Sequence, residues 1–180
     1  AQQRASLLQH PSKAIAAQAA ALLATAGTPT RAAVMEKFKT ALSLAGDAAR
    51  GKQVFTVTGC IACHQLDGTG LPVGPDLRSV VSHVPEKLLS SILDPRAVIE
   101  PGFTAYHGTL KSGEQLYGIA ATETSGSITM RLPGNVLRSV LRSEIDGLKS
   151  TQSSLMPDGL EALFTPQSLA DLIAYLKVPK

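Results

Sequence analysis

Apolar residues recur at helical spacing in the first 45 residues, and this pattern predicts two helices. Ser12 is positioned to cap the first helix and Gly27 to end it, while Thr28-Pro29 opens the second as a cap followed by Pro at the first helical position. The two apolar faces are Ile15, Ala19, Leu22, Leu23 and Ala26, then Val34, Phe38, Ala41, Leu42 and Ala45. We expect an αα-hairpin, either the last unit of a helical repeat array or an extension packed on the following domain.

Three more helices are expected further along the chain. Asp47 opens the first, over residues 48–58, and Gly59 ends it. The second runs over 85–93 and is closed by Asp94-Pro95. The last begins at Thr165-Pro166, and its apolar stripe consists of Leu169, Leu172, Ile173 and Leu176.

Between residues 101 and 150 the pattern changes to β-rich segments separated by turn residues. The segments are 103–111, 115–122, 127–132 and 135–141, and the turns are Ser112-Gly113, Ser125-Gly126 and Pro133-Gly134. This spacing predicts an antiparallel meander of three or four strands, inserted into an otherwise helical chain.

Composition and charge exclude several classes of function. The formal net charge is only +3 and Lys and Arg do not cluster, so we expect no nucleic-acid partner. No apolar run reaches the about 18 residues of a membrane span, so we expect no transmembrane segment. The sequence starts at Ala1 without a signal peptide, so we expect Ala1 to be a processing site or an artificial boundary.

Both cysteines of the chain lie in the motif Cys60-Ile61-Ala62-Cys63-His64. Two thiols at this spacing can each add to one vinyl group of a single porphyrin, which places His64 under the iron as its proximal ligand. A thioredoxin-like redox pair has the same spacing but needs a βαβ setting. A zinc site needs two more ligands at suitable spacing. We therefore favour one covalent haem c, attached through Cys60 and Cys63.

The haem iron then has a sixth ligand or an open face. The candidates are Met35, Met130, Met156, His10, His83 and His107. Met156 precedes Pro157 in a loop before the last helix, whereas Met130 alternates with polar neighbours in a β segment and is expected to pack there. Met35 is expected to face into the N-terminal hairpin. The residue pattern alone does not choose among these ligands.

With these motifs the chain resembles the class I c-type cytochromes over about residues 47–100 and 151–180. The matching runs are 51–55 before the Cys pair, Gly74-Pro75-Asp76-Leu77 after it, Met156-Pro157, and 172–176 in the last helix. The resemblance implies that the first and last helices of the domain cross, with Gly51 and Phe55 meeting Tyr175. It also implies that the Pro75 carbonyl orients the His64 ring, that Pro75 and Leu77 bind the haem, and that Met156 is the distal ligand.

A closer resemblance is to the C-terminal haem-binding modules of large exported dehydrogenase-like proteins of planctomycetes and related bacteria. It includes the runs 46–51, 91–95, 101–103 and 154–160. We expect a mainly α protein with the class I cytochrome c fold, in which residues 1–46 form a helical extension and 47–180 the cytochrome c domain. The β insert at about 101–150 departs from minimal cytochromes and offers His107 as a rival ligand.

The expected function is single-electron transfer rather than catalysis. A haem iron with His64 and Met156 as ligands keeps both in either oxidation state, and Met raises the potential. Electrons would come from a partner or fused dehydrogenase and pass to a downstream carrier, in the bacterial periplasm or another exported location. The alternative is a peroxidase-like enzyme or gas sensor with an open sixth position, where His107 or Glu100 would supply an acid or base.

Overall fold

The computed structural model describes residues 6–25 and 29–179. The chain divides into two compact units, with the division between Ala33 and Val34. In the first unit, α2 spans Lys13–Thr25 directly after Ser12, as predicted. Gly27 and Thr28, the predicted stop and cap, lie outside the described residues, as does Ala26. The domain boundary between residues 46 and 47 stays a prediction.

The second unit begins within α3, which spans Arg31–Phe38 and continues as the 3-10 helix η1, Lys39–Ser43. Val34, Phe38 and Ala41 are buried, as their spacing predicts. Met35 packs against the core that contains these residues, and its expected orientation into the N-terminal hairpin stays a prediction. It follows Val34 directly, and its flexible thioether side chain reaches the same apolar surface.

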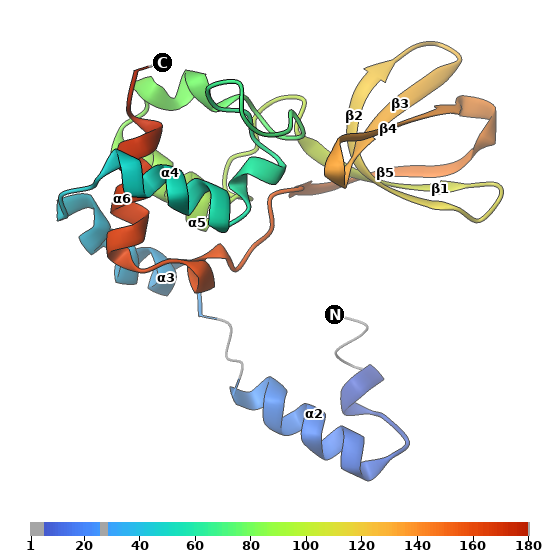
Figure 1. Ribbon diagram of the computed structural model, residues 1–180. Helices are drawn as coiled ribbons and strands as arrows, with labels where there is room; N and C mark the ends of the chain where they lie inside the picture. The colour runs from blue at the N-terminus through green and yellow to red at the C-terminus, as the bar shows by residue number, and fades with distance from the viewer. Residues whose placement is uncertain (1–5, 26–28, 180) are drawn as a thin grey trace. The chain divides into compact units, whose positions relative to one another are not determined.

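The three helices predicted for the following domain are all present (Figure 1). They are α4, Ala48–Val57; α5, Pro85–Leu93; and α6, Pro166–Leu176. Asp47 caps α4 by accepting a hydrogen bond from the Arg50 N–H at 2.8 Å. Thr165 caps α6 by accepting one from the Ser168 N–H at 3.1 Å. These side chains satisfy N–H groups that the helices themselves leave unpaired.

Helices α4 and α6 cross in close contact, which confirms the crossing that the family resemblance implied (Figure 1). A Cβ on Gly51 would lie only 2.7 Å from the Cβ of Tyr175, so glycine is what lets the two backbones approach. The ring centroids of Phe55 and Tyr175 lie 5.8 Å apart with the ring planes tilted by 57°, a favourable aromatic geometry.

A buried carboxylate holds the N-terminal end of this crossing. Asp171 on α6 is only 3% exposed. It accepts hydrogen bonds from the Asp47 N–H at 2.8 Å, from Arg50 Nε and Nη2 at 2.8 and 2.9 Å, and from Gln167 Nε2 at 3.0 Å. The Arg50 guanidinium, first among these partners, lowers the pKa of Asp171 to about 2 despite the opposing effect of burial.

Short 3-10 helices connect the longer elements. They are η2, Cys60–Ala62; η3, Leu77–Ser82; η4, Pro133–Asn135; η5, Arg142–Glu144; and η6, Leu160–Leu163.

The inserted segment forms one antiparallel sheet in the order β4-β3-β2-β1-β5 (Figure 1). Its strands are β1, Thr104–Leu110; β2, Gln115–Glu123; β3, Ser127–Leu132; β4, Val136–Leu141; and β5, Ile145–Ser154. The first four make the predicted meander. The fifth returns to pair with β1, so that Thr104 lies opposite Ser154.

The prediction of three or four strands is therefore wrong, because β5 was not foreseen. That strand lies at the edge of the sheet, and its C-terminal half is polar and largely exposed, so it lacks the apolar alternation of a half-buried strand. The mainly α fold class is likewise not confirmed, since a five-stranded sheet stands beside the helices.

Two separate apolar cores support the second unit. We call them the helical core and the sheet core. The helical core joins residues of α3, η1, α4, α5 and α6, among them Phe38, Phe55, Leu89, Leu93, Leu169 and Leu172. The sheet core contains Leu110, Leu116, Ile128, Met130 and Val140. The helical core positions the segment that carries the cysteines.

Candidate functional site

The two cysteines and His64 are brought together by a single tight turn at the end of α4. Gly59 adopts a left-handed conformation with φ of 83°, which ends the helix and starts η2. The backbone N–H groups of Cys63 and His64 both donate to the Cys60 carbonyl, at 3.1 and 2.9 Å. The backbone conformation of the motif is therefore set by local hydrogen bonds within the chain itself.

Both thiols are half-buried and free. Burial raises the pKa of the Cys60 thiol and of the Cys63 thiol, and Thr58, 3.4 Å from the Cys60 sulfur, opposes this only in part. A reactive thiol pair needs the opposite shift, because the thiolate is the nucleophile. The environment therefore does not favour a thioredoxin-like redox pair.

His64 is oriented by a hydrogen bond to the Pro75 carbonyl, with Nδ1 and the oxygen 2.8 Å apart. Because a carbonyl oxygen only accepts, Nδ1 carries the proton and Nε2 keeps its lone pair for a metal. Burial lowers the pKa of His64, although the bond to Pro75 partly offsets it. The ring is thus held as a neutral imidazole, the form that ligates iron.

The loop from Gln65 to Pro75 folds back on the motif through backbone hydrogen bonds. The N–H groups of Val73 and Gly74 donate to the Cys63 carbonyl at 3.0 and 2.6 Å, and that of Leu77 donates to the Gln65 carbonyl at 2.9 Å. A Cβ on Gly74 would lie 2.7 Å from Cε1 of His64, so a side chain here would press on the ring. Leu77, at the start of η3, packs against the helical core.

Met156 belongs to a different segment, two residues beyond β5. It is half-buried, and its N–H donates to the Ser154 hydroxyl at 3.0 Å. Two residues later, Asp158 forms an ion pair with Arg96 at 2.6 Å, which ties the Met156 loop to the segment after α5. The structure thus anchors Met156 at both sides, while its role as an iron ligand stays a prediction.

The other candidate iron ligands, and Glu100, lie in environments different from that of Met156. Met130 is fully buried in the sheet core, which confirms the expected packing role. His107 is exposed on β1, opposite Tyr117 and Lys149. His83 is half-buried, and its Nε2 lies 3.1 Å from the Lys87 ammonium. Glu100 is exposed between α5 and β1.

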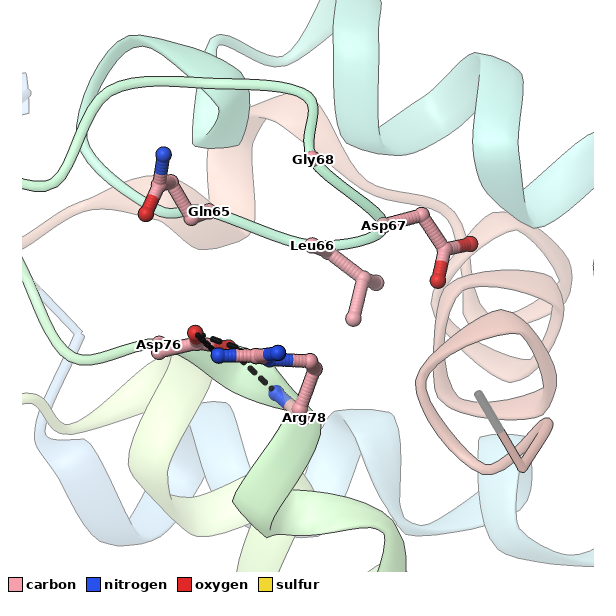
Figure 2. Close-up of a pocket in the computed structure, with 6 residues that line it drawn as sticks. All are labelled: Gln65, Leu66, Asp67, Gly68, Asp76 and Arg78. Carbon is pink, nitrogen blue, oxygen red and sulfur yellow. Dashed lines mark hydrogen bonds and ion pairs between the residues drawn. The ribbon is translucent and has the colours of Figure 1, made fainter.

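A shallow pocket lies along the segment that follows His64 (Figure 2). It is lined by Gln65, Leu66, Asp67, Gly68, Asp76 and Arg78. Figure 2 shows the Arg78 guanidinium forked onto the Asp76 carboxylate, with the shortest N–O distance 2.6 Å. This lining is mostly polar, so the pocket does not suit an apolar macrocycle.

The donor set fits a covalent haem. Two neutral thiols three residues apart, an imidazole with its free nitrogen set by Pro75, and a glycine beside that ring are what such a group needs from the chain. The sequence also matches the family model for cytochrome c over residues 48–115.

This segment is similar to cytochrome c. The match contains Cys60, Cys63 and His64 and ends before Met156, and it supports electron transfer through haem with redox partners as the general activity. No curated protein matches the chain. Within residues 6–25 and 29–179, no helix combines the length and the apolar character needed to cross a bilayer.

Besides the Asp171 contacts, two polar contacts near the cysteine motif and the Met156 loop could not be read from the sequence. The first is the Arg96–Asp158 ion pair beside the Met156 loop. The second is Arg131 on β3, whose Nη1 donates to the Pro72 carbonyl in the loop before Pro75. Both join residues far apart in the sequence, where no local pattern connects them. Arg96 does follow Asp94-Pro95, and Asp158 follows Met156-Pro157, so each partner lay next to a run already singled out.

Proposed function

We propose that the chain transfers single electrons through one haem c, held covalently by Cys60 and Cys63, with His64 and Met156 as axial ligands. The observation that carries this proposal is the hydrogen bond between His64 Nδ1 and the Pro75 carbonyl. It leaves only Nε2 available to iron and strengthens the imidazole as a donor.

Each cysteine has a defined task in this proposal. The S–H of Cys60 and that of Cys63 each add across one vinyl double bond, so a C–S and a C–H bond form without net oxidation. When bound, the haem supplies a reversible one-electron change at iron. Pro75 holds the proximal ring, and the turn around Gly59 fixes the spacing of the thiols.

The partners we propose are a dehydrogenase that donates electrons, encoded separately or in a longer version of this chain, and a downstream carrier. The resemblance to modules of exported dehydrogenase-like proteins supports this assignment. Because haem c is attached outside the cytoplasm, we also propose an exported location such as the bacterial periplasm. Contact with each partner would be small and transient.

The test is the spectrum of the holoprotein and of Met156→Leu, with Met130→Leu as the control. Leucine conserves the volume of methionine, and Met130 lies in the sheet core, so both variants are expected to fold. The wild type should show low-spin bands and the weak ferric Met–iron band near the infrared. Met156→Leu should lose that band and bind carbon monoxide quickly, while Met130→Leu should retain wild-type behaviour.

Other results would contradict parts of the proposal. A low-spin wild type without the Met–iron band would point to a histidine ligand, with His107 first in line. A high-spin wild type that binds carbon monoxide quickly would replace electron transfer by a peroxidase-like or gas-sensing function. A protein without haem, even after expression with the maturation machinery, would overturn the assignment of Cys60, Cys63 and His64.

A further inference from the structure

The inserted sheet touches the loop that orients the proximal histidine. Arg131 projects from β3, and its Nη1 donates a hydrogen bond to the carbonyl of Pro72. Its Nε is buried and, among the described residues, has no hydrogen-bond partner. Arg131 is thus half-buried, with Nε shielded from solvent and Nη1 bonded to the loop.

Each side of this contact carries buried apolar residues next to the bonded pair, in the sheet and in the loop. Ala105, Ile119 and Arg131 occupy opposed positions on β1, β2 and β3, so they form one row on the face opposite to Met130. Ala105 and Ile119 are 0% and 5% exposed, yet neither belongs to the sheet core. Val73, next to Pro72, is 2% exposed and likewise lies outside both cores. The Arg131–Pro72 hydrogen bond, with buried residues on each side of it, supports packing of this row on the Pro72 loop.

The position of the Pro72 loop determines where the Pro75 carbonyl meets the His64 ring. From Pro72 the chain runs through Val73 and Gly74, whose N–H groups hold the Cys63 carbonyl, to Pro75, whose carbonyl accepts the His64 Nδ1 proton. Prolines at both ends restrict the backbone of this four-residue segment. A displacement of Pro72 is therefore expected to move the Pro75 carbonyl and change the length of its hydrogen bond with His64.

We propose that Arg131 is a positioning residue through which the inserted sheet sets the strength of the His64–Pro75 hydrogen bond, and with it the redox potential of the haem. This inference rests on the proposed function.

The experiment compares Arg131→Gln with Arg138→Gln in the holoprotein. Arg138 lies on β4, pairs with Glu114 at 3.0 Å and is not part of the Pro72 contact, so its replacement removes the same charge from the same sheet. Two quantities are measured: the midpoint potential, and the exchange rate of the His64 Nδ1 proton by NMR of the reduced protein.

The sign of the potential shift separates positioning from simple charge. A weaker bond from Nδ1 makes the imidazole a poorer donor, which destabilises Fe(III) and raises the potential. Loss of a nearby positive charge stabilises Fe(III) and lowers the potential. We expect Arg131→Gln to raise the potential and to speed proton exchange about tenfold, with Arg138→Gln close to wild type in both.

Arg131→Lys keeps the positive charge and a hydrogen-bond donor group, so its potential and its exchange rate should lie between those of wild type and Arg131→Gln. It is the variant to measure if Arg131→Gln does not accumulate. A lowered potential with unchanged exchange, or wild-type values in both Arg131 variants, would overturn the inference. A wild type with c-type bands but unchanged variants overturns this inference alone. A wild type without c-type bands overturns the proposed function and the inference together.

Discussion

At the scale of single residues, the site depends on Gly74 leaving room for the His64 ring. We expect Gly74→Ala to displace the ring or lengthen its bond to Pro75, because the new Cβ would lie 2.7 Å from Cε1. The holoprotein should lose about 1–3 kcal/mol of stability and show altered low-spin bands, measured by thermal unfolding and visible spectra. The control is Gly126→Ala, where a Cβ meets nothing within 4 Å. Equal behaviour of the two variants would contradict this account.

Asp171 gives a pH dependence with a definite sign. Its folded-state pKa of about 2 lies below its ordinary value of 3.8, so its ionised form stabilises the fold above pH 3.8. That contribution is lost as the pH falls through the interval from 3.8 to 2. We expect Asp171→Asn to be less stable than wild type by about 1–3 kcal/mol at neutral pH, with the difference shrinking across that interval.

Urea unfolding of both proteins from pH 7 to pH 2 measures this effect. Gln167→Ala serves as a milder comparison, since Gln167 supplies only one of the hydrogen bonds to Asp171. A difference between wild type and Asp171→Asn that stays constant with pH would show that the stabilisation does not come from the carboxylate charge.

Residue-level prediction from the sequence succeeded where the partners lie close together along the chain. The spacing of Cys60, Cys63 and His64 is local, and the turn that joins them spans five residues. Asp171 and Arg131 were missed because Arg50 lies 121 positions from Asp171 and Pro72 lies 59 positions from Arg131. No local sequence pattern identifies these contacts, because only the folded chain brings the partners together.

At the scale of elements, the Met156 loop is held by the Arg96–Asp158 ion pair. If Met156 is the distal ligand, we expect Arg96→Gln to raise the binding constant of imidazole for ferric iron about two- to fivefold. The loss of the pair frees the loop to move away, while exposure of both partners keeps the effect modest. Titration of the ferric holoprotein with imidazole measures it.

Arg78→Gln is a closely matched control for this prediction. The Arg78–Asp76 pair has the same 2.6 Å separation and a similar exposure, but it lies on the segment after Pro75. An equal rise in both variants would show that overall charge, rather than the anchoring of the Met156 loop, controls ligand access.

Elements with explicit start and stop residues could be predicted from the sequence, and the others could not. Asp47 and Thr165 both cap the helices they were expected to open. β5 could not be predicted because its pairing with β1, rather than its own composition, makes it a strand. The edge position leaves one side of it unpaired, so little apolar alternation is required.

At the scale of the whole molecule, the helical core and the sheet core are separate clusters of buried residues. We expect Met130→Ala to destabilise the sheet by about 2–5 kcal/mol while amides in α4 and α6 keep wild-type protection. Hydrogen exchange measured by NMR or mass spectrometry resolves the two regions. Phe55→Ala is the reciprocal variant, and it should weaken α4 and α6 first. Equal loss of protection in both regions for either variant would show that the second unit unfolds as one cooperative body.

The pairing of β1 with β5 explains how the helical part of the second unit can carry so large an insert. Because Thr104 lies opposite Ser154, the chain leaves the domain and returns to it at adjacent points. The entropy lost in closing this long excursion is therefore compensated by strand pairing within the insert itself, and the connection from α5 to Met156 behaves as a short loop. The sheet is therefore a self-contained insertion. Its strands and turns can be lengthened or replaced while Thr104 and Ser154 keep the two ends of the helical part adjacent.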